Sequence, residues 1–216
     1  MELTTERVYW MRVRKIKNLE QKIKAYDHLL LKNPGTIGQH FDQKSLELEI
    51  GFGKGDFLLE MARRHPERNF LGIERSSAFA LKAMREVGDL DNIRFMTGNV
   101  QNLLPLMEDN LFSGLYLNFS DPWPKPRHYK RRLTYRQLLL DYDRILKPGS
   151  LVQIKTDSKT LFAFTLEELF ALKKQAFDVT LDLHRDARWK ENIPTIYEEK
   201  FSAQGKSILG LRYRSE

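Results

Sequence analysis

From Ser45 to about residue 173, short apolar segments alternate with segments of helical periodicity. The apolar segments, which we expect to be strands, are residues 46–50, 69–73, 93–97, 111–117 and 150–155. The segments expected to be helices are residues 56–64, 76–87, 100–107 (weakly helical), 134–146 and 157–173. This alternation predicts an α/β fold with a Rossmann-like, mostly parallel sheet and helices on both faces.

The C-terminal part departs from this alternation. Residues 176–183, 197–203 and 207–214 are expected to be strands, and no comparable helix separates the last two. The sheet should therefore end in a C-terminal antiparallel hairpin. We expect a single domain over residues 36–216 and a basic N-terminal arm or helix at residues 1–35. Within the latter, residues 17–32 have helical spacing, but an arm that becomes ordered only on a partner fits equally.

The net charge is +7, from 36 Lys and Arg against 29 Asp and Glu, which indicates a polyanionic partner. The absence of cysteine excludes disulfides, thiolate catalysis and cysteine zinc sites. The five histidines lack metal-ligand spacing, so we expect no metal. No signal peptide or membrane span is recognisable, and we expect a cytoplasmic protein without membrane contact. The oligomeric state, monomer or homodimer, stays open.

A glycine-rich turn, Glu49-Ile-Gly-Phe-Gly-Lys-Gly55, lies between the first expected strand and the first expected helix. Gly51, Gly53 and Gly55 allow a sharp backbone turn and the close approach of a ligand. The spacing differs from the G-x-G-x-x-G of dinucleotide folds, and it is not that of a phosphate-binding P-loop. A tight turn that only packing requires is the alternative.

Two further residues fit a nucleoside ligand. Glu74 ends the second expected strand, 23 residues after Gly51, where an acid can accept hydrogen bonds from both ribose hydroxyls of an adenosine. Asn99 follows the third expected strand, and its side-chain oxygen could face an adenine amino group. The alternatives are a helix N-terminal acid for Glu74 and a turn former for Asn99.

The segment Asn118-Phe-Ser-Asp-Pro-Trp-Pro-Lys-Pro-Arg-His-Tyr-Lys-Arg-Arg-Leu133, here called the proline loop, follows a buried strand. Its three prolines should prevent regular structure and make it stiff. Asp121 and Trp123 come first, and six basic residues follow before the next acid: Lys125, Arg127, Lys130, Arg131, Arg132 and Arg136. An acid, an aromatic face and a basic run suit a nucleotide base and its phosphate backbone, although a loop with solvated charges is the alternative.

Asp157 follows the fifth expected strand and opens a helix. It can be the N-cap of that helix and also face a ligand at the carboxyl edge of the sheet, where open α/β folds bind ligands. Thr195-Ile-Tyr-Glu198 precedes a late expected strand, and Glu198 and Glu199 place acids near the same edge.

Together these motifs resemble the bacterial tRNA (guanine-N7-)-methyltransferases over about residues 45–205. The resemblance rests on the glycine-rich turn, Gly72-Ile-Glu74, the proline loop with Tyr116-Leu before it and Thr134 after it, Lys155-Thr-Asp157 and Thr195-x-Tyr-Glu-x-Lys-Phe201. The Asn-Phe-Ser-Asp-Pro-Trp-Pro-Lys run is the most specific part. Asn99 stands where many members carry Asp.

This resemblance implies a class I methyltransferase domain, with S-adenosylmethionine as methyl donor and tRNA as substrate. The implied product is 7-methylguanosine at position 46 of the tRNA variable loop. The resemblance assigns Asp121 as the catalytic residue. The donor-binding residues are Glu49, Gly51, Gly53, Glu74, Asn99 and Asp121; the substrate-binding residues are Lys125, Asp157, Thr195, Ile196, Tyr197 and Glu198.

Guanine N7 carries an in-plane lone pair, so no general base is required, and the enzyme must chiefly align N7 with the methyl carbon. A carboxylate suits the N1–H and N2–H donors of guanine, and Asp121, Asp157 and Glu198 are the candidates. We expect the basic run from Lys125 to Arg132 to contact tRNA phosphates. A non-catalytic RNA-binding protein and a nicotinamide-dependent oxidoreductase are the alternative functions.

Overall fold

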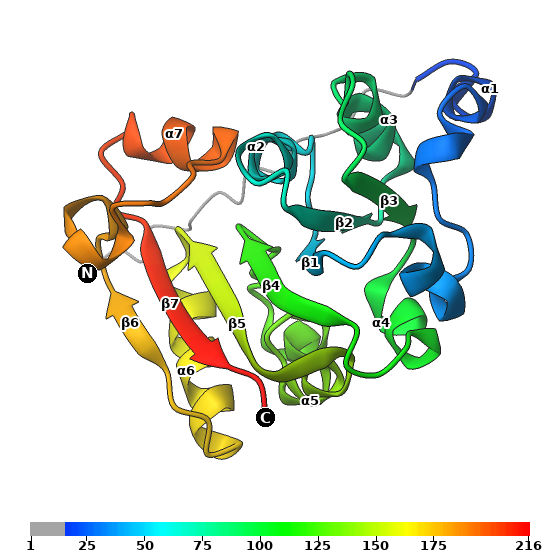
Figure 1. Ribbon diagram of the computed structural model, residues 1–216. Helices are drawn as coiled ribbons and strands as arrows, with labels where there is room; N and C mark the ends of the chain where they lie inside the picture. The colour runs from blue at the N-terminus through cyan, green and yellow to red at the C-terminus, as the bar shows by residue number, and fades with distance from the viewer. Residues whose placement is uncertain (1–15) are drawn as a thin grey trace.

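The centre of the molecule is a seven-stranded sheet in the order β3-β2-β1-β4-β5-β7-β6 (Figure 1). Our computed structural model describes residues 16–216. The strands are β1 (Ser45–Ile50), β2 (Arg68–Glu74), β3 (Ile93–Thr97), β4 (Phe112–Asn118), β5 (Leu146–Thr156), β6 (Phe177–Thr180) and β7 (Leu209–Arg214). The first five pair in parallel, whereas β7 is antiparallel to both β5 and β6. The predicted mixed sheet is therefore confirmed.

Helices cover both faces of this sheet, as predicted (Figure 1). They are α1 (Leu19–Lys24), α2 (Asp56–Arg64), α3 (Ser77–Arg85), α4 (Val100–Leu103), α5 (Arg136–Ile145), α6 (Lys159–Ala171) and α7 (Ile196–Ser202). In β2, Phe70 packs in one apolar cluster with α2 and α3, whereas Leu71 and Ile73 pack in the other, with α5 and α6. Successive residues of a strand point to opposite faces, so this near-continuous apolar strand serves both clusters.

The expected strand at residues 197–203 is wrong, because this segment forms helix α7. Thr195 caps the helix, and its hydroxyl oxygen accepts a hydrogen bond from the Glu198 N–H at 3.0 Å. Tyr197 and Phe201, four residues apart, bring their rings together on one side of the helix, with centroids 6.3 Å apart. The antiparallel pair at the end of the sheet is instead formed by β6 and β7.

Two predicted helix starts also differ from the structure. Ser158, rather than Asp157, caps α6, because its hydroxyl accepts a hydrogen bond from the Leu161 N–H at 3.2 Å. The helix α5 begins at Arg136, not at Thr134, whose buried hydroxyl instead accepts a bond from Thr165 at 2.9 Å. The proline loop also contains a 3₁₀ helix at Pro126–Arg131, although we expected no regular structure there.

In place of the helix expected at residues 17–32, the structure has the short helix α1, which ends at Lys24, and a 3₁₀ turn at Asp27–Leu29. Leu29 and Leu31 are buried, and the Leu31 N–H donates to the Phe95 carbonyl of β3 at 2.8 Å. Residues 29–31 therefore pack on the sheet. Residues 1–15 of the expected N-terminal arm lie outside the described part of the chain, and a boundary near residue 35 stays a prediction.

Candidate active site

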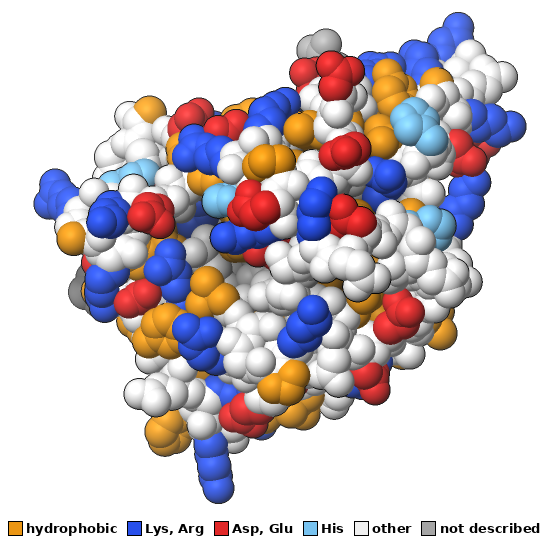
Figure 2. All heavy atoms as spheres, viewed as in Figure 1, with side chains coloured by type: hydrophobic (Ala, Val, Ile, Leu, Met, Phe, Trp, Pro, Cys, Tyr) orange, Lys and Arg blue, Asp and Glu red, His pale blue; other side chains and the backbone are white. Residues whose placement is uncertain are grey.

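The carboxyl ends of the parallel strands border a cavity of about 900 Å³. Its wall includes most of the residues selected from the sequence: Glu49, Gly51, Gly53, Glu74, Asn99, Asp121, Asp157, Thr195 and Tyr197. Lys125, Ile196 and Glu198 are not part of this wall. The parallel topology explains the grouping, because strand ends that are distant in sequence meet at one edge of the sheet. On the face drawn in Figure 2, basic side chains are interspersed with acidic ones.

The glycine-rich turn has two kinds of glycine. Gly51, Gly53 and Gly55 all have positive φ angles, of 80°, 60° and 86°, which favour glycine. A Cβ added to Gly55 would lie 2.6 Å from the Cβ of Ala83, so helix packing requires this glycine. A Cβ added to Gly51 or Gly53 would meet nothing within 4 Å. These two glycines therefore leave open space where the turn borders the cavity, and packing alone does not explain them.

Glu74 joins the end of β2 to the glycine-rich turn. Its Oε2 accepts a hydrogen bond from the Gly53 N–H at 3.1 Å, and its Oε1 accepts one from the Ser76 N–H at 2.8 Å. The pKa of Glu74 is raised by burial, and the hydrogen bonds from these two backbone donors make the rise smaller. Each carboxylate oxygen has a further lone pair, so both can still accept a bond from a ligand hydroxyl.

Glu49 and Asn118 border the cavity, and each has a buried side-chain oxygen without a hydrogen-bond partner. The Glu49 side chain is only 2% exposed, and its Oε1 accepts a hydrogen bond from Asn118 Nδ2 at 2.9 Å. Glu49 Oε2 and Asn118 Oδ1 are buried without a hydrogen-bond partner. Burial raises the pKa of Glu49 to about 8, against the lowering effects of Asn118 and Lys155. Two buried acceptors beside a cavity suit a ligand that brings hydrogen-bond donors or positive charge.

Asn99 caps the short helix α4, and its Oδ1 accepts a hydrogen bond from the Gln101 N–H at 3.2 Å. The turn-forming role considered for Asn99 is therefore present. Asn99 also borders the cavity, and its contact with an adenine stays a prediction.

Asp121 lies in the proline loop between two residues with left-handed backbone, Phe119 (φ 50°) and Trp123 (φ 42°). Asp121 is exposed, although the surrounding protein still desolvates its carboxyl and so raises its pKa, which the nearby Arg75 lowers. The Arg131 guanidinium lies 4.9 Å from the centre of the Trp123 ring. The loop thus presents a carboxylate, an aromatic ring and a cation at the cavity wall.

The basic residues of this region differ in accessibility. Lys125, Arg127, Lys130 and Arg131 are exposed, whereas Arg132 is 6% exposed and donates to two carbonyl oxygens within the proline loop. The burial of Arg132 disfavours the phosphate contact expected for it. Farther along, Arg136 forms an ion pair with Glu168 at 2.9 Å.

Some residues of the segment from Thr195 to Glu198 border the cavity, and others do not. Thr195 and Tyr197 border the cavity. The Ile196 side chain is exposed, and its N–H donates to Asp56 Oδ2 at the start of α2 at 3.1 Å. Glu198 is fully buried, and its Oε2 lies 2.7 Å from Lys155 Nζ.

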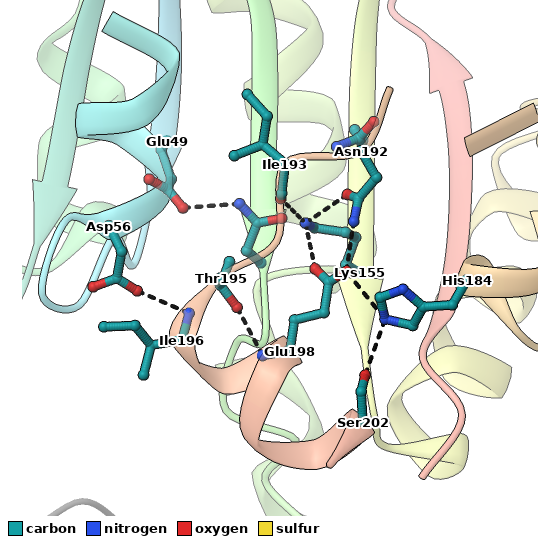
Figure 3. Close-up of polar contacts among 12 residues, drawn as sticks. Glu49, Asp56, Lys155, His184, Asn192, Ile193, Thr195, Ile196, Glu198 and Ser202 are labelled. Carbon is teal, nitrogen blue, oxygen red and sulfur yellow. Dashed lines mark hydrogen bonds and ion pairs between the residues drawn. The ribbon is translucent and has the colours of Figure 1, made fainter. Parts of the chain in front are cut away.

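Lys155 is fully buried at the end of β5 and holds this segment (Figure 3). Its ammonium group donates to Glu198 Oε2 at 2.7 Å, to the Ile193 carbonyl at 2.8 Å and to Asn192 Oδ1 at 2.9 Å. Burial lowers the pKa of Lys155, and the Glu198 carboxylate opposes this change. The second oxygen of Glu198 accepts a hydrogen bond from Asn192 and lies 3.3 Å from His184 Nε2. Glu198 therefore fastens α7 to the sheet.

Sequence reasoning did not identify Lys155 or Asn118 as members of the site. The available signal was a polar side chain near the carboxyl end of each of two adjacent strands. The partners of these side chains, Glu198 and Glu49, lie 43 and 69 residues away, so only the fold brings them together.

Asp157 borders the cavity as predicted, and its Oδ2 lies 3.6 Å from Lys206 Nζ. Within residues 16–216 no group of three acidic or histidine side chains has the arrangement of a metal site. No helix in the same range is long and apolar enough to cross a membrane.

Known proteins share this sequence and this fold. Residues 43–211 match a family model described as "Putative methyltransferase". The chain is 42% identical to a tRNA (guanine-N(7)-)-methyltransferase of Lacticaseibacillus casei, covering 93% of this chain and 97% of the relative. It is 39% identical to the protein of the same name from Geobacillus kaustophilus, with 95% and 96% coverage.

Solved structures support the fold at low sequence identity. A 16S rRNA methyltransferase, KamB, superposes with a TM-score of 0.59 at 13% identity, covering 95% of this chain and 97% of that one. An antibiotic-related methyltransferase gives a TM-score of 0.58 at 15% identity, with 94% and 96% coverage. The sheet order, the helices on both faces and these neighbours establish the class I methyltransferase fold. With the extent and identity of the sequence matches, they show that the chain belongs to the tRNA (guanine-N7-)-methyltransferase family.

Proposed function

We propose that this protein transfers the methyl group of S-adenosylmethionine to N7 of a guanine in tRNA. The observation that carries the proposal is the cavity itself. It joins the glycine-rich turn and Glu74, which suit a nucleoside donor, to Asp121 and Trp123 of the proline loop, which suit a base. The family membership of the chain agrees with this assignment.

The residues of the cavity fit the donor. Glu74 has free lone pairs for two ribose hydroxyls, and Gly51 and Gly53 allow the donor to approach the backbone. The unsatisfied acceptors of Glu49 and Asn118 suit its positively charged amino group. When bound, the donor supplies a methyl group that its sulfonium already activates.

For the guanine, the protein's task is alignment, since N7 needs no deprotonation. Glu198 is unsuited to reading the base edge, because Lys155 and Asn192 occupy its two oxygens. Asp121 and Asp157, which border the cavity, remain the candidate acceptors for guanine N1–H and N2–H. We propose that Asp121 aligns the base with the donor and that Thr195 and Tyr197 border the bound base.

The substrate assignment extends to the site on the tRNA. We propose guanine 46 of the variable loop as the target, from the family resemblance, and the cytoplasm as the compartment, because it contains the tRNA. The exposed cations Lys125, Arg127, Lys130 and Arg131 would contact the phosphates.

Two other functions are less compatible with the site. A nicotinamide-dependent oxidoreductase would leave the proline loop unexplained and lacks the expected glycine spacing. A non-catalytic RNA-binding protein would not require the open glycine turn or Glu74.

The test is to incubate the protein with unmodified tRNA and methyl-labelled donor, then digest the tRNA and identify the labelled nucleoside. We expect 7-methylguanosine, and its loss when guanine 46 is replaced in the transcript. Label in another nucleoside would refute the N7 assignment. Label that persists in the substituted tRNA would refute the position. Binding of tRNA without calorimetric binding of the donor would support the RNA-binding alternative.

A further inference from the structure

Arg132 differs from the other basic residues of the proline loop. Its neighbours Lys130 and Arg131 are exposed, whereas Arg132 is 6% exposed. Its guanidinium lies over the Phe164 ring of α6, with the central carbon 4.4 Å from the ring centre. A buried cation stacked on a core helix is poorly placed to meet an RNA phosphate, so its role must lie within the protein.

The contacts of Arg132 define that role. Its Nε donates to the Pro122 carbonyl at 2.9 Å, and its Nη2 donates to the Trp123 carbonyl at 3.2 Å. These carbonyls belong to the two residues that directly follow Asp121. The planar guanidinium presents several donors in a fixed fork, so one side chain can hold both carbonyls at once.

The backbone around Asp121 requires such support. Phe119 and Trp123, two residues before and after Asp121, both have left-handed φ angles, although neither is glycine. Bulky residues adopt this conformation only where the surrounding structure holds them in it. Phe119 is held by its N–H, which donates to the Lys155 carbonyl of β5 at 2.8 Å. On the other side of Asp121, Arg132 holds the Trp123 carbonyl.

We propose that Arg132 is a positioning residue, which fixes the Asp121 carboxylate in the cavity wall by holding the Pro122 and Trp123 carbonyls. The inference rests on the proposed function, because it assigns to Asp121 the alignment of base and donor. It separates the basic run into two roles. Arg132 sets the shape of the loop, and the exposed cations meet the RNA.

The test compares Arg132→Gln and Arg132→Lys with the matched surface variant Lys130→Gln. Single-turnover methyl transfer is measured with saturating donor and tRNA, at a temperature where thermal melts show every variant to be folded. Donor affinity by calorimetry and the salt dependence of tRNA binding are measured in parallel. Phe164→Leu, which changes no charge and keeps both carbonyl partners, is a further variant in case Arg132→Gln fails to fold.

For Arg132→Gln we expect the saturated transfer rate to fall by ~10- to 100-fold, because a small misplacement of the aligning group is costly. Donor affinity and the salt slope should stay unchanged. Arg132→Lys should not restore the rate, because an ammonium group cannot reproduce the fork. Phe164→Leu should lower the rate in the same direction, by less. Lys130→Gln should lower the salt slope of tRNA binding by about 1, because Lys130 is one of the cations proposed to contact phosphates.

Full activity of Arg132→Lys, or a lower salt slope with an unchanged saturated rate in Arg132→Gln, would overturn the proposal in favour of a phosphate contact. A normal saturated rate in all folded variants would leave Arg132 a purely structural role and would equally overturn it.

Limited trypsin digestion separates this inference from the proposed function. Cleavage after Arg127 should be faster in Arg132→Gln than in the wild type or Lys130→Gln. If the wild type forms no 7-methylguanosine, the proposed function fails. Faster cleavage of Arg132→Gln would then still support the claim that Arg132 holds the proline loop. Unchanged cleavage would overturn this claim too.

Discussion

Replacing Glu49 by Gln should make the protein more stable at alkaline pH and weaken its binding of the donor. The Glu49 carboxyl is buried, and its pKa rises from 4.5 to about 8 in the folded protein. At about 1.4 kcal/mol per pH unit, this difference corresponds to roughly 5 kcal/mol of unfolding free energy. Gln is similar in size and keeps an oxygen for Asn118, but it cannot ionise.

The sign follows from the direction of the change. A carboxyl whose pKa is higher in the folded state contributes stability that is complete below its unfolded value of 4.5. This stability is lost as the pH rises through the folded pKa of about 8. The unfolding free energy of the wild type, relative to Glu49→Gln, should therefore fall by several kcal/mol between pH 5 and pH 8.5, roughly 3 kcal/mol of it by pH 7.

Donor binding should change in the opposite direction, because a cationic donor favours the ionised carboxylate. With a pKa of about 8, ionised Glu49 is about 1% of the total at pH 6 and half at pH 8. The donor affinity of the wild type relative to Glu49→Gln should therefore rise by up to ~50-fold over this range. The ratio cancels titration of the donor's own amino group, which is common to both proteins.

Urea denaturation of both proteins from pH 5 to 8.5, with calorimetric titration of the donor at each pH, measures both effects. Parallel stability curves would show that Glu49 ionises normally in the folded protein. A pH-independent affinity ratio would show that its charge does not contact the donor.

Three further predictions concern neighbouring residues. Glu74→Ala should weaken donor binding by ~1.5–3 kcal/mol and Glu74→Gln by less; unchanged calorimetric affinity in folded Glu74→Ala would contradict the ribose role. Asp121→Asn and Asp121→Ala should bind tRNA nearly normally, while kcat falls by ~100-fold or more; a near-wild-type single-turnover rate would transfer the aligning role to Asp157. Lys155→Met and Glu198→Gln should each lower the unfolding free energy. For Lys155→Met the loss should be ~3–5 kcal/mol, because it leaves the buried Glu198 charge unpaired. The double variant should lose less than the sum of the two single losses. Additive losses in urea denaturation would show that the two groups are not coupled.

Sequence periodicity determined most of the sheet and helices of this protein. The five parallel strands are long enough and apolar enough that burial on both faces dictates their conformation. Glycines with positive φ in the turn after β1 are recognisable from residue type, because few other residues adopt that conformation. The residues at strand ends, such as Glu74 and Asp121, could be chosen from the sequence, because a parallel sheet brings its carboxyl ends to one edge.

Short segments near residue 200 were decided by tertiary structure. Residues 197–203 were expected to form a strand, but the Thr195 cap, the four-residue spacing of Tyr197 and Phe201 and the burial of Glu198 against Lys155 favour a helix. A local pattern of seven residues is too weak to outweigh such contacts, and the Lys155 partner is 43 residues away.

The roles of individual charges also depended on the fold. By type, Lys130, Arg131 and Arg132 are alike in the sequence, and only the three-dimensional path of the loop turns Arg132 toward α6 and the Pro122 and Trp123 carbonyls. Likewise, Glu49, Glu74 and Glu198 are all acids near a strand end or helix start. In the folded protein, Glu49 has an unsatisfied acceptor, Glu74 is bound to backbone N–H groups, and Glu198 forms an ion pair. Residue type determines which chemistry is available, whereas burial and the approach of partners that are distant in sequence determine which of it is used.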